Sequence, residues 1–192
     1  MDPRQRRTQA KLHAAVLTLA EAGPIAEVTM TQLTAEAGVH RSTLYEHAAS
    51  PFALLEAALT AELDEIGTGL AEGEEQGASV TEVTRAVLEH VLAHRAIYRR
   101  GLGEGSGASS LHPMLSRHFR GSGAVVFATH DWSALTEVTG ATAGELSEAA
   151  GLFLAEGTVG QIAGWIAGAE PDVDRFLRVY LALAPAWWPG RR

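Results

Sequence analysis

Histidine side chains are the first candidates for chemistry in this 192-residue chain, which contains eight histidines and no cysteine. His90 and His94 are four residues apart, so on a helix both imidazoles would lie on one face, as a two-histidine metal site requires. The spacing supplies no third ligand, and the chain lacks the Gly-x-Ser-x-Gly, P-loop and His-Glu-x-x-His motifs. We therefore predict no metal site, no cofactor and no enzymatic activity. A small helical enzyme that uses His90 and His94 is kept as an alternative.

A second group of polar side chains is suited to contacting nucleic acid. Arg41, Ser42, Thr43 and Tyr45 fall on the outer side of a predicted short helix, and such side chains bind phosphates and base edges in DNA grooves. A short N-terminal arm, residues 1–7, adds three arginines. The residues expected at a DNA interface are Arg4, Arg6, Arg7, Met30, Thr31, His40, Arg41, Ser42, Thr43, Tyr45 and His47.

The elements that would position these side chains form a helix-turn-helix. Thr29 followed by Gln32 is a capping box, which predicts a helix from Met30. Gly38 favours the left-handed conformation that ends a helix, so this helix should run only to about Ala37. A second helix follows, and Ser50 before a proline predicts the start of the next.

These residues resemble the DNA-binding domain of the TetR family of bacterial transcriptional repressors. The resemblance rests on Val28-Thr29, the run from Leu33 to Val39, Ser42 to Tyr45, His47 and Leu54-Leu55, and it covers the first quarter to third of the chain. It implies a repressor that binds double-stranded operator DNA as a homodimer and responds to a small-molecule effector. The chain departs from the family at His40, at Ala48 and at Pro51, where a phosphate-binding lysine is usual.

The chain is long enough for one domain or two small ones, and its charge is unevenly distributed. Hydrophobic residues make up 46% of the chain, and the formal net charge is −8, which argues against nonspecific coating of nucleic acid. Five basic and five acidic residues cancel within residues 1–50, so the whole charge lies on residues 51–192. We predict an all-α fold with a three-helix DNA-binding domain at 1–50, here called the head. The effector-binding and dimerisation domain at 51–192 is called the body.

Helical periodicity and caps predict the remaining elements. Helices are expected at about 8–22 and from Pro51 to Ile66, where Gly67 would end the second one. A capping box of Ser79 and Glu82 predicts a further helix that runs to Arg100. The remaining helices are expected at 111–119, from Thr142 to near Gly168, and from Pro171 to Leu183. Residues 101–110 are expected to be a flexible Gly/Ser linker. The type of structure in 122–137 is not assigned. No apolar stretch reaches transmembrane length, and we expect a cytoplasmic protein.

Four glycines share one face of the helix that ends near Gly168. Glycine inside a helix costs about 1 kcal/mol relative to alanine, so a stripe of them calls for a compensating contact such as a close helix crossing. The residues expected in a dimer interface are Gly157, Gly160, Gly164, Gly168, Phe176 and Tyr180. The alternatives are a crossing within one chain, or simply the Gly/Ala bias of a chain that contains 20 glycines.

The function predicted from the sequence is a ligand-responsive repressor that binds a near-palindromic operator. Aromatic side chains commonly line small-molecule cavities, although core packing is the default role for any one of them. The residues named for ligand binding are His94, Tyr98, Phe119, Phe127 and Trp165. A helical interaction module that has lost DNA binding is a further alternative, since the head has no net charge and Pro51 offers neither charge nor amide.

Overall fold

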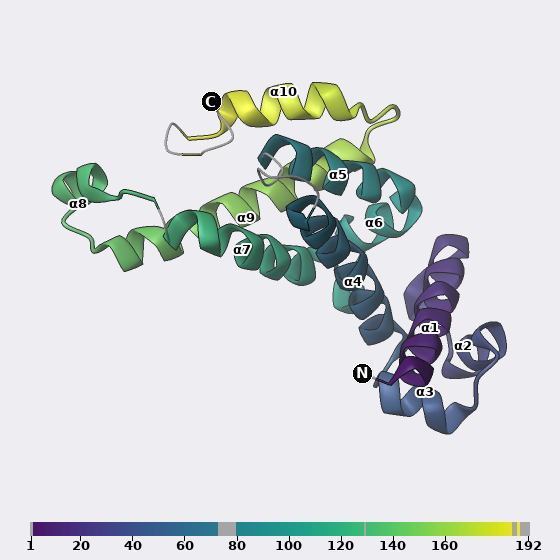
Figure 1. The fold of residues 1–192 in the computed structure, drawn as a ribbon. Helices are drawn as coiled ribbons and strands as arrows, with labels where there is room; N and C mark the ends of the chain where they lie inside the picture. The colour runs from purple at the N-terminus through teal and green to yellow at the C-terminus, as the bar shows by residue number, and fades with distance from the viewer. Residues whose placement is uncertain (1, 73–79, 129, 186–187, 189–192) are drawn as a thin grey trace.

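All regular structure in the described residues is helical, which confirms the predicted all-α fold (Figure 1). The computed structural model describes residues 2–72, 80–128, 130–185 and 188. Its α-helices are α1 (Pro3–Ala22), α2 (Met30–Ala37), α3 (Arg41–His47), α4 (Pro51–Glu72), α5 (Val80–Ala93), α6 (Arg95–Leu102), α7 (His112–Ala128), α8 (Ser133–Thr139), α9 (Ala143–Ala167) and α10 (Val173–Leu183). Two short 3-10 helices, η1 (Ile25–Glu27) and η2 (Gly107–Ser109), lie in the connections.

The helix-turn-helix is built as its local sequence predicts. Thr29 and Gln32 form both hydrogen bonds of a capping box, in which the hydroxyl accepts from the Gln32 amide and the Gln32 side chain accepts from the Thr29 amide. Gly38 ends α2 at φ +61°, and Leu44 of α3 is fully buried. Ser50 caps α4 by accepting from the amide of Ala53 at 3.1 Å.

The N-terminal segment differs from the expected arm, because α1 begins at Pro3 and not near Thr8. Asp2 is its N-cap and accepts a hydrogen bond from the Arg4 amide at 2.8 Å, while proline at the first position suits a helix start. The expectation of a short arm at residues 1–7 was therefore wrong. All three arginines lie on the first two turns of α1.

Helix α4 joins the head to the body through one continuous hydrophobic core. It packs along α1, and leucines at 12, 54, 55 and 59 belong to the same buried cluster as Tyr98 and Ile162 in the body. The helix also continues through Gly67 to Glu72, past the end at Ile66 that the sequence suggested. The division into domains at 1–50 and 51–192 stays a prediction, because this core runs across it.

The helix predicted from residue 80 to Arg100 is two helices, with a break at His94 (φ −105°, ψ 33°). The imidazole of His94 contacts carboxylates of two other helices, a tertiary constraint that local periodicity cannot register. The capping box predicted at the start of this segment includes Ser79, which lies outside the described residues.

Residues 101–110 comprise the end of α6 and a connection that contains η2, so the flexible linker expected there was wrong. Backbone hydrogen bonds close the segment, including one of 2.9 Å from the Leu111 amide to the Gly101 carbonyl. Leu111 packs so closely on Gly101 that an added Cβ would lie 2.5 Å from its side chain. The helix after it, α7, runs to Ala128 and not only to residue 119, and α8 follows within the unassigned region.

The C-terminal half is organised on α9, which begins at the predicted Thr142 and Glu145 capping box and has Gly168 as its C-cap. Helix α7 packs along α9, and a second small core around Phe127 and Trp132 lies toward the end that carries α8, far from the head in Figure 1. Helix α10 starts after Asp172, two residues later than expected. Among the described residues, no helix is long and apolar enough to span a bilayer.

We expect Gly38→Ala to lower the free energy of unfolding by about 1–2 kcal/mol, because a Cβ is strained at φ +61° although nothing within 4 Å would contact it. Gly23→Ala is the matched control, since Gly23 also ends a helix in open space but has extended backbone (φ −164°). Urea denaturation of both variants checks this. Equal unfolding free energies for the two variants would contradict it.

Candidate functional site

Helix α3 presents a polar outer face beside its buried anchor. Arg41, Ser42 and Tyr45 are exposed, Tyr45 by 50%, while Leu44 on the opposite side is fully buried. A short helix held from beneath, with hydrogen-bonding side chains outward, can enter a major groove of about 12 Å width.

Arg41 and Tyr45 form one unit on this face. The guanidinium donates to the Tyr45 hydroxyl at 3.0 Å, and it lies 5.4 Å from the centroid of the ring. The two residues are one turn apart, which allows this contact. Sequence reasoning named both residues but missed their pairing, although the spacing of four carried the signal. The contact gives the guanidinium a partner on its own helix.

The other residues predicted to contact DNA lie around α3. Thr31 and His40 are exposed, and His40 makes no side-chain cap bond to α3, while Met30, Thr43 and His47 are half-buried. Met30 also packs against the core.

Arg4, Arg6 and Arg7 are exposed on the first turns of α1, whose N-terminal end lies on the α3 side of the head in Figure 1. Basic side chains repel the positive end of a helix dipole, and the first turn holds no acidic residue. The carboxylate of Asp2, the N-cap, already offsets part of this repulsion.

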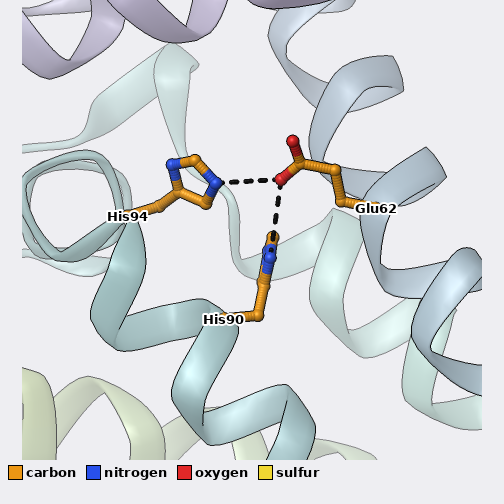
Figure 2. Close-up of side chains that lie close together, drawn as sticks. All are labelled: Glu62, His90 and His94. Atoms are coloured by element: carbon orange, nitrogen blue, oxygen red, sulfur yellow. Dashed lines mark hydrogen bonds and ion pairs between the residues drawn. The ribbon is translucent and has the colours of Figure 1, made fainter.

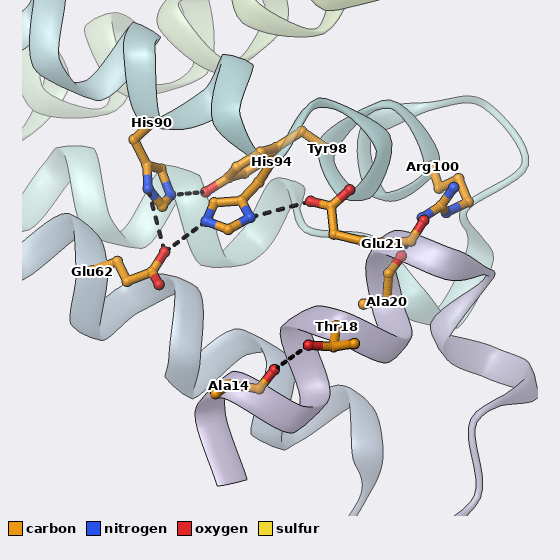
Figure 3. A network of polar contacts seen from close by, with 9 residues as sticks. All are labelled: Ala14, Thr18, Ala20, Glu21, Glu62, His90, His94, Tyr98 and Arg100. Carbon is orange, nitrogen blue, oxygen red and sulfur yellow. Dashed lines mark hydrogen bonds and ion pairs between the residues drawn. The ribbon is translucent and has the colours of Figure 1, made fainter. Parts of the chain in front are cut away.

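The junction between head and body contains a cation and a cavity. Arg100 of α6 donates to the carbonyl oxygens of Ala20 and Glu21, the latter at 3.1 Å, and so caps the C-terminal end of α1 (Figure 3). Beside it lies a cavity of about 380 Å³ between η1 of the head and α6 of the body. Its walls include Pro24, Ile25, Leu55, Ile97, Arg99 and Arg100.

A histidine and carboxylate network lies on the other side of this junction (Figures 2 and 3). His94 contacts Glu62 of α4 at 2.9 Å and Glu21 of α1 at 3.2 Å, and His90 contacts the Tyr98 hydroxyl at 2.9 Å. Burial, together with the nearby His94 and His118, lowers the pKa of His90 from 6.5 to about 4, so its ring is neutral at pH 7. Burial also raises the pKa of Tyr98 above its usual value.

The five residues predicted to bind a ligand are not gathered in one place. His94 and Tyr98 both belong to the network just described, whereas Phe127 is in the second core and Trp165 contacts Phe176 on α10. Phe119 packs against the main core. None of the five lines the cavity at the junction, so their role in ligand binding stays a prediction.

The glycine face of α9 is open. A Cβ added at Gly157, Gly160 or Gly164 would meet nothing within 4 Å, so no helix of the described chain crosses there, and the crossing within one chain was wrong. Phe153, one turn before Gly157 on the same face, is 68% exposed. On α10, the exposed apolar residues are Val179 (49%) and Leu183 (68%).

Three other residues named for the dimer interface are placed differently. Gly168 is the C-cap of α9, outside the helix interior. Phe176 and Tyr180 are each 7% exposed, and the Tyr180 hydroxyl hydrogen-bonds Thr158 at 2.9 Å. These two side chains lie in the chain's own core.

The fold is similar to solved structures of transcription regulators. The dihydroxyacetone kinase operon activator DhaS matches with a TM-score of 0.63 at 12% identity, covering 91% of this chain and 94% of that one. A TetR transcriptional regulator from Rhodococcus sp. RHA1 gives 0.60 at 20% identity over 95% and 100% of the two chains. A TetR-family regulator from Streptomyces coelicolor gives 0.59 at 21% over 95% and 80%.

No family model matches the sequence, and no curated protein matches it. At these identities the likeness concerns the fold alone, and the chain has the fold of TetR-family regulators.

We expect Arg100→Ala to lower the free energy of unfolding by about 2 kcal/mol, because two carbonyls at the end of α1 lose a charged donor. Arg99→Ala is the control, since Arg99 is the exposed neighbour of Arg100 and does not cap α1. Urea denaturation measures both variants. A loss for Arg99→Ala as large as that for Arg100→Ala would contradict the capping role.

Proposed function

We propose that this protein is a transcription regulator that binds a near-palindromic DNA operator as a homodimer, represses transcription and is released by a small molecule. The observation that carries the proposal is the outward polar face of α3, where Arg41 and Tyr45 project from a helix-turn-helix on a body with the TetR-family fold. We assign base contacts to Arg41, and phosphate contacts to Arg4, Arg6 and Arg7.

The open glycine face of α9 supports the homodimer. Three interior glycines and Phe153 offer a smooth apolar stripe that nothing in the described chain covers, and Leu183 adds an exposed apolar residue on α10. Small residues let two helix backbones approach closely, and a second copy supplies an identical stripe. A two-fold dimer would read two half-sites separated by about 34–36 Å or a multiple of it.

The cavity at the junction supports regulation by a ligand. Its volume of about 380 Å³ is within the usual range for small-molecule sites, and it is lined mostly by apolar residues with two arginines at its edge. A ligand that filled it would contact η1, α4 and α6 together and so change how the head sits on the body. Linkage then requires the ligand to bind the free protein more tightly than the DNA complex.

Selection of bound sequences from random duplex DNA tests the function. We expect a near-palindrome to be enriched, and Arg41→Ala to weaken binding to it by about 1–3 kcal/mol while relaxing one base preference. Because the Tyr45 hydroxyl holds Arg41, Tyr45→Phe should cost much less in the Arg41→Ala background, with a coupling of about 0.5–3 kcal/mol.

Fluorescence anisotropy on the selected duplex measures these dissociation constants. Arg120→Ala on α7 is the control, since it removes an exposed arginine from the body. Enrichment of no sequence, or the same selected sequences and affinity for Arg41→Ala as for the unchanged protein, would refute the base-reading role. Transcription from the selected site then separates repression from activation, the role named for one structural neighbour.

We expect Gly160→Glu to convert the dimer to a folded monomer, because a carboxylate on the apolar stripe would lose its hydration at the interface without a partner. In the single chain the same side chain meets open space. Gly121→Glu on α7 is the matched control, a helical glycine with equally open surroundings outside this face. Light scattering at micromolar concentration checks the mass. Dimeric Gly160→Glu, or an unchanged protein that is monomeric, would rule out this interface.

A further inference from the structure

Three side chains from separate helical turns converge on one point in the body (Figure 2). The Oε2 atom of Glu62 on α4 lies 2.9 Å from Nε2 of His94 and 3.5 Å from Nδ1 of His90. The three ligand atoms lie within 4.8 Å of one another. The third ligand that sequence spacing did not supply therefore comes from α4, 28 residues before His90 in the chain.

The opposite nitrogen of each imidazole has its own partner (Figure 3). Nε2 of His90 lies 2.9 Å from the Tyr98 hydroxyl, and Nδ1 of His94 lies 3.2 Å from Glu21 of α1. Metal-bound histidines commonly have such a partner on the second nitrogen, which fixes the tautomer and the ring orientation. Both inner nitrogens are thereby directed to the same side as the Glu62 carboxylate.

We propose that Glu62, His90 and His94 bind a divalent transition metal ion, with Zn²⁺ as the best fit and a fourth position open to water or a small ligand. A tetrahedral ion with ligand bonds of about 2.0–2.1 Å places its ligand atoms about 3.3 Å apart. The two distances from Glu62, 2.9 and 3.5 Å, lie on either side of that value, and all three ligand atoms lie within 4.8 Å of one another, so side-chain movements of about 1 Å would complete the geometry.

The donor set and the charge select the class of ion. Imidazole nitrogens suit Zn²⁺, Ni²⁺ and Co²⁺, whereas Mg²⁺ and Ca²⁺ prefer oxygen ligands throughout. The carboxylates of Glu62 and Glu21 together carry two negative charges, which balance a dication. The His90 and His94 side chains are only 7% and 19% exposed, while Glu62 at 38% leaves a path from solvent.

A proton on His94 is the competing explanation for the same contacts. A doubly protonated ring could donate to Glu62 and to Glu21 at once, and a metal ion would then have to displace the proton that faces Glu62. In that case added Zn²⁺ would bind no more tightly here than at other surface histidines. The two explanations therefore predict different titrations.

The test is a Co²⁺ titration of the full-length, tag-free protein after treatment with a chelator, followed by visible absorption. We expect the bands of a four- or five-coordinate ion to appear with one equivalent of Co²⁺ and to vanish with one equivalent of Zn²⁺. His94→Gln and Glu62→Gln should each weaken the affinity at least 10-fold, and Glu21→Gln about 10–100-fold through loss of the outer partner.

His112→Gln is the matched control, because it removes an imidazole that contacts the Glu156 carboxylate at 2.6 Å without a second histidine. It should bind Co²⁺ as the unchanged protein does, and circular dichroism should show every variant folded. Absence of the bands in the unchanged protein, or full affinity in both His94→Gln and Glu62→Gln, would overturn the site.

The site also connects the proposed metal to the head, since Glu21 lies near the end of α1. If the protein regulates transcription as proposed, Zn²⁺ should change the affinity for the selected operator, and operator should change the affinity for Zn²⁺ by the same factor. This expected coupling between Zn²⁺ and operator rests on the proposed function, whereas the Co²⁺ titration does not. Metal binding without any selected operator would refute the proposed function and leave the site intact, while an operator with no metal binding would do the reverse.

Discussion

The packing of α1 against α4 is the contact on which the rest of the structure depends. Helix α1 carries Leu12, Val16 and Ala20 into a core that α4 completes with Leu55 and Leu59, and each of these side chains is at most 2% exposed. Helix α2 packs on α1 and α3 packs on α2, with Leu33 of α2 and Leu44 of α3 buried in the same core, and the body packs against α4 through α5 and α7. At about 25 cal/mol per Å² of buried apolar surface, such a shared core ties the orientation of the head to the state of the body. Two further contacts with α1, from Arg100 to its terminal carbonyls and from His94 to Glu21, fall on the last turn of the same helix. The head therefore has little freedom to move unless α1, α4 and α6 move together.

Features fixed by residues close together in sequence could be predicted, and features fixed by distant residues could not. Capping boxes at Thr29 and Thr142 and the left-handed Gly38 depend on neighbours within four positions, and each was confirmed. The break at His94 coincides with contacts to Glu62 and Glu21, which lie 32 and 73 positions away, and the apolar periodicity of the sequence continues through it. Glu62 is also distant in sequence from His90 and His94, so the sequence analysis found two candidate metal ligands and no third. The outward polar side of α3 could be predicted from the sequence, since it follows from one helix and the buried Leu44, whereas its role in binding DNA stays a prediction.

Glycine-rich stretches misled the sequence analysis in two ways. Residues 101–110 read as a linker, yet the small size of Gly101 lets Leu111 fold back on it and close a turn. Gly67 was expected to end its helix, although α4 continues through it. In contrast, the glycines of α9 were correctly placed on one face, but periodicity alone could not say whether that face is covered. The sequence shows where glycines leave space, but whether another part of the chain fills that space depends on the tertiary structure.

If the proposed homodimer forms through the uncovered glycines of α9, the stability of this protein would depend on its abundance. Three interior glycines weaken an isolated helix by about 1 kcal/mol each relative to alanine, and no contact within the described chain offsets that cost. Contacts from a second copy could do so, and the gain would then follow mass action, growing as the chain concentration rises above the dissociation constant of the pair. A scarce regulator would exist as single chains with a less stable α9, exposed to unfolding and proteolysis. An abundant one would be protected by its own association, so the lifetime of the protein would depend on how much of it a cell contains.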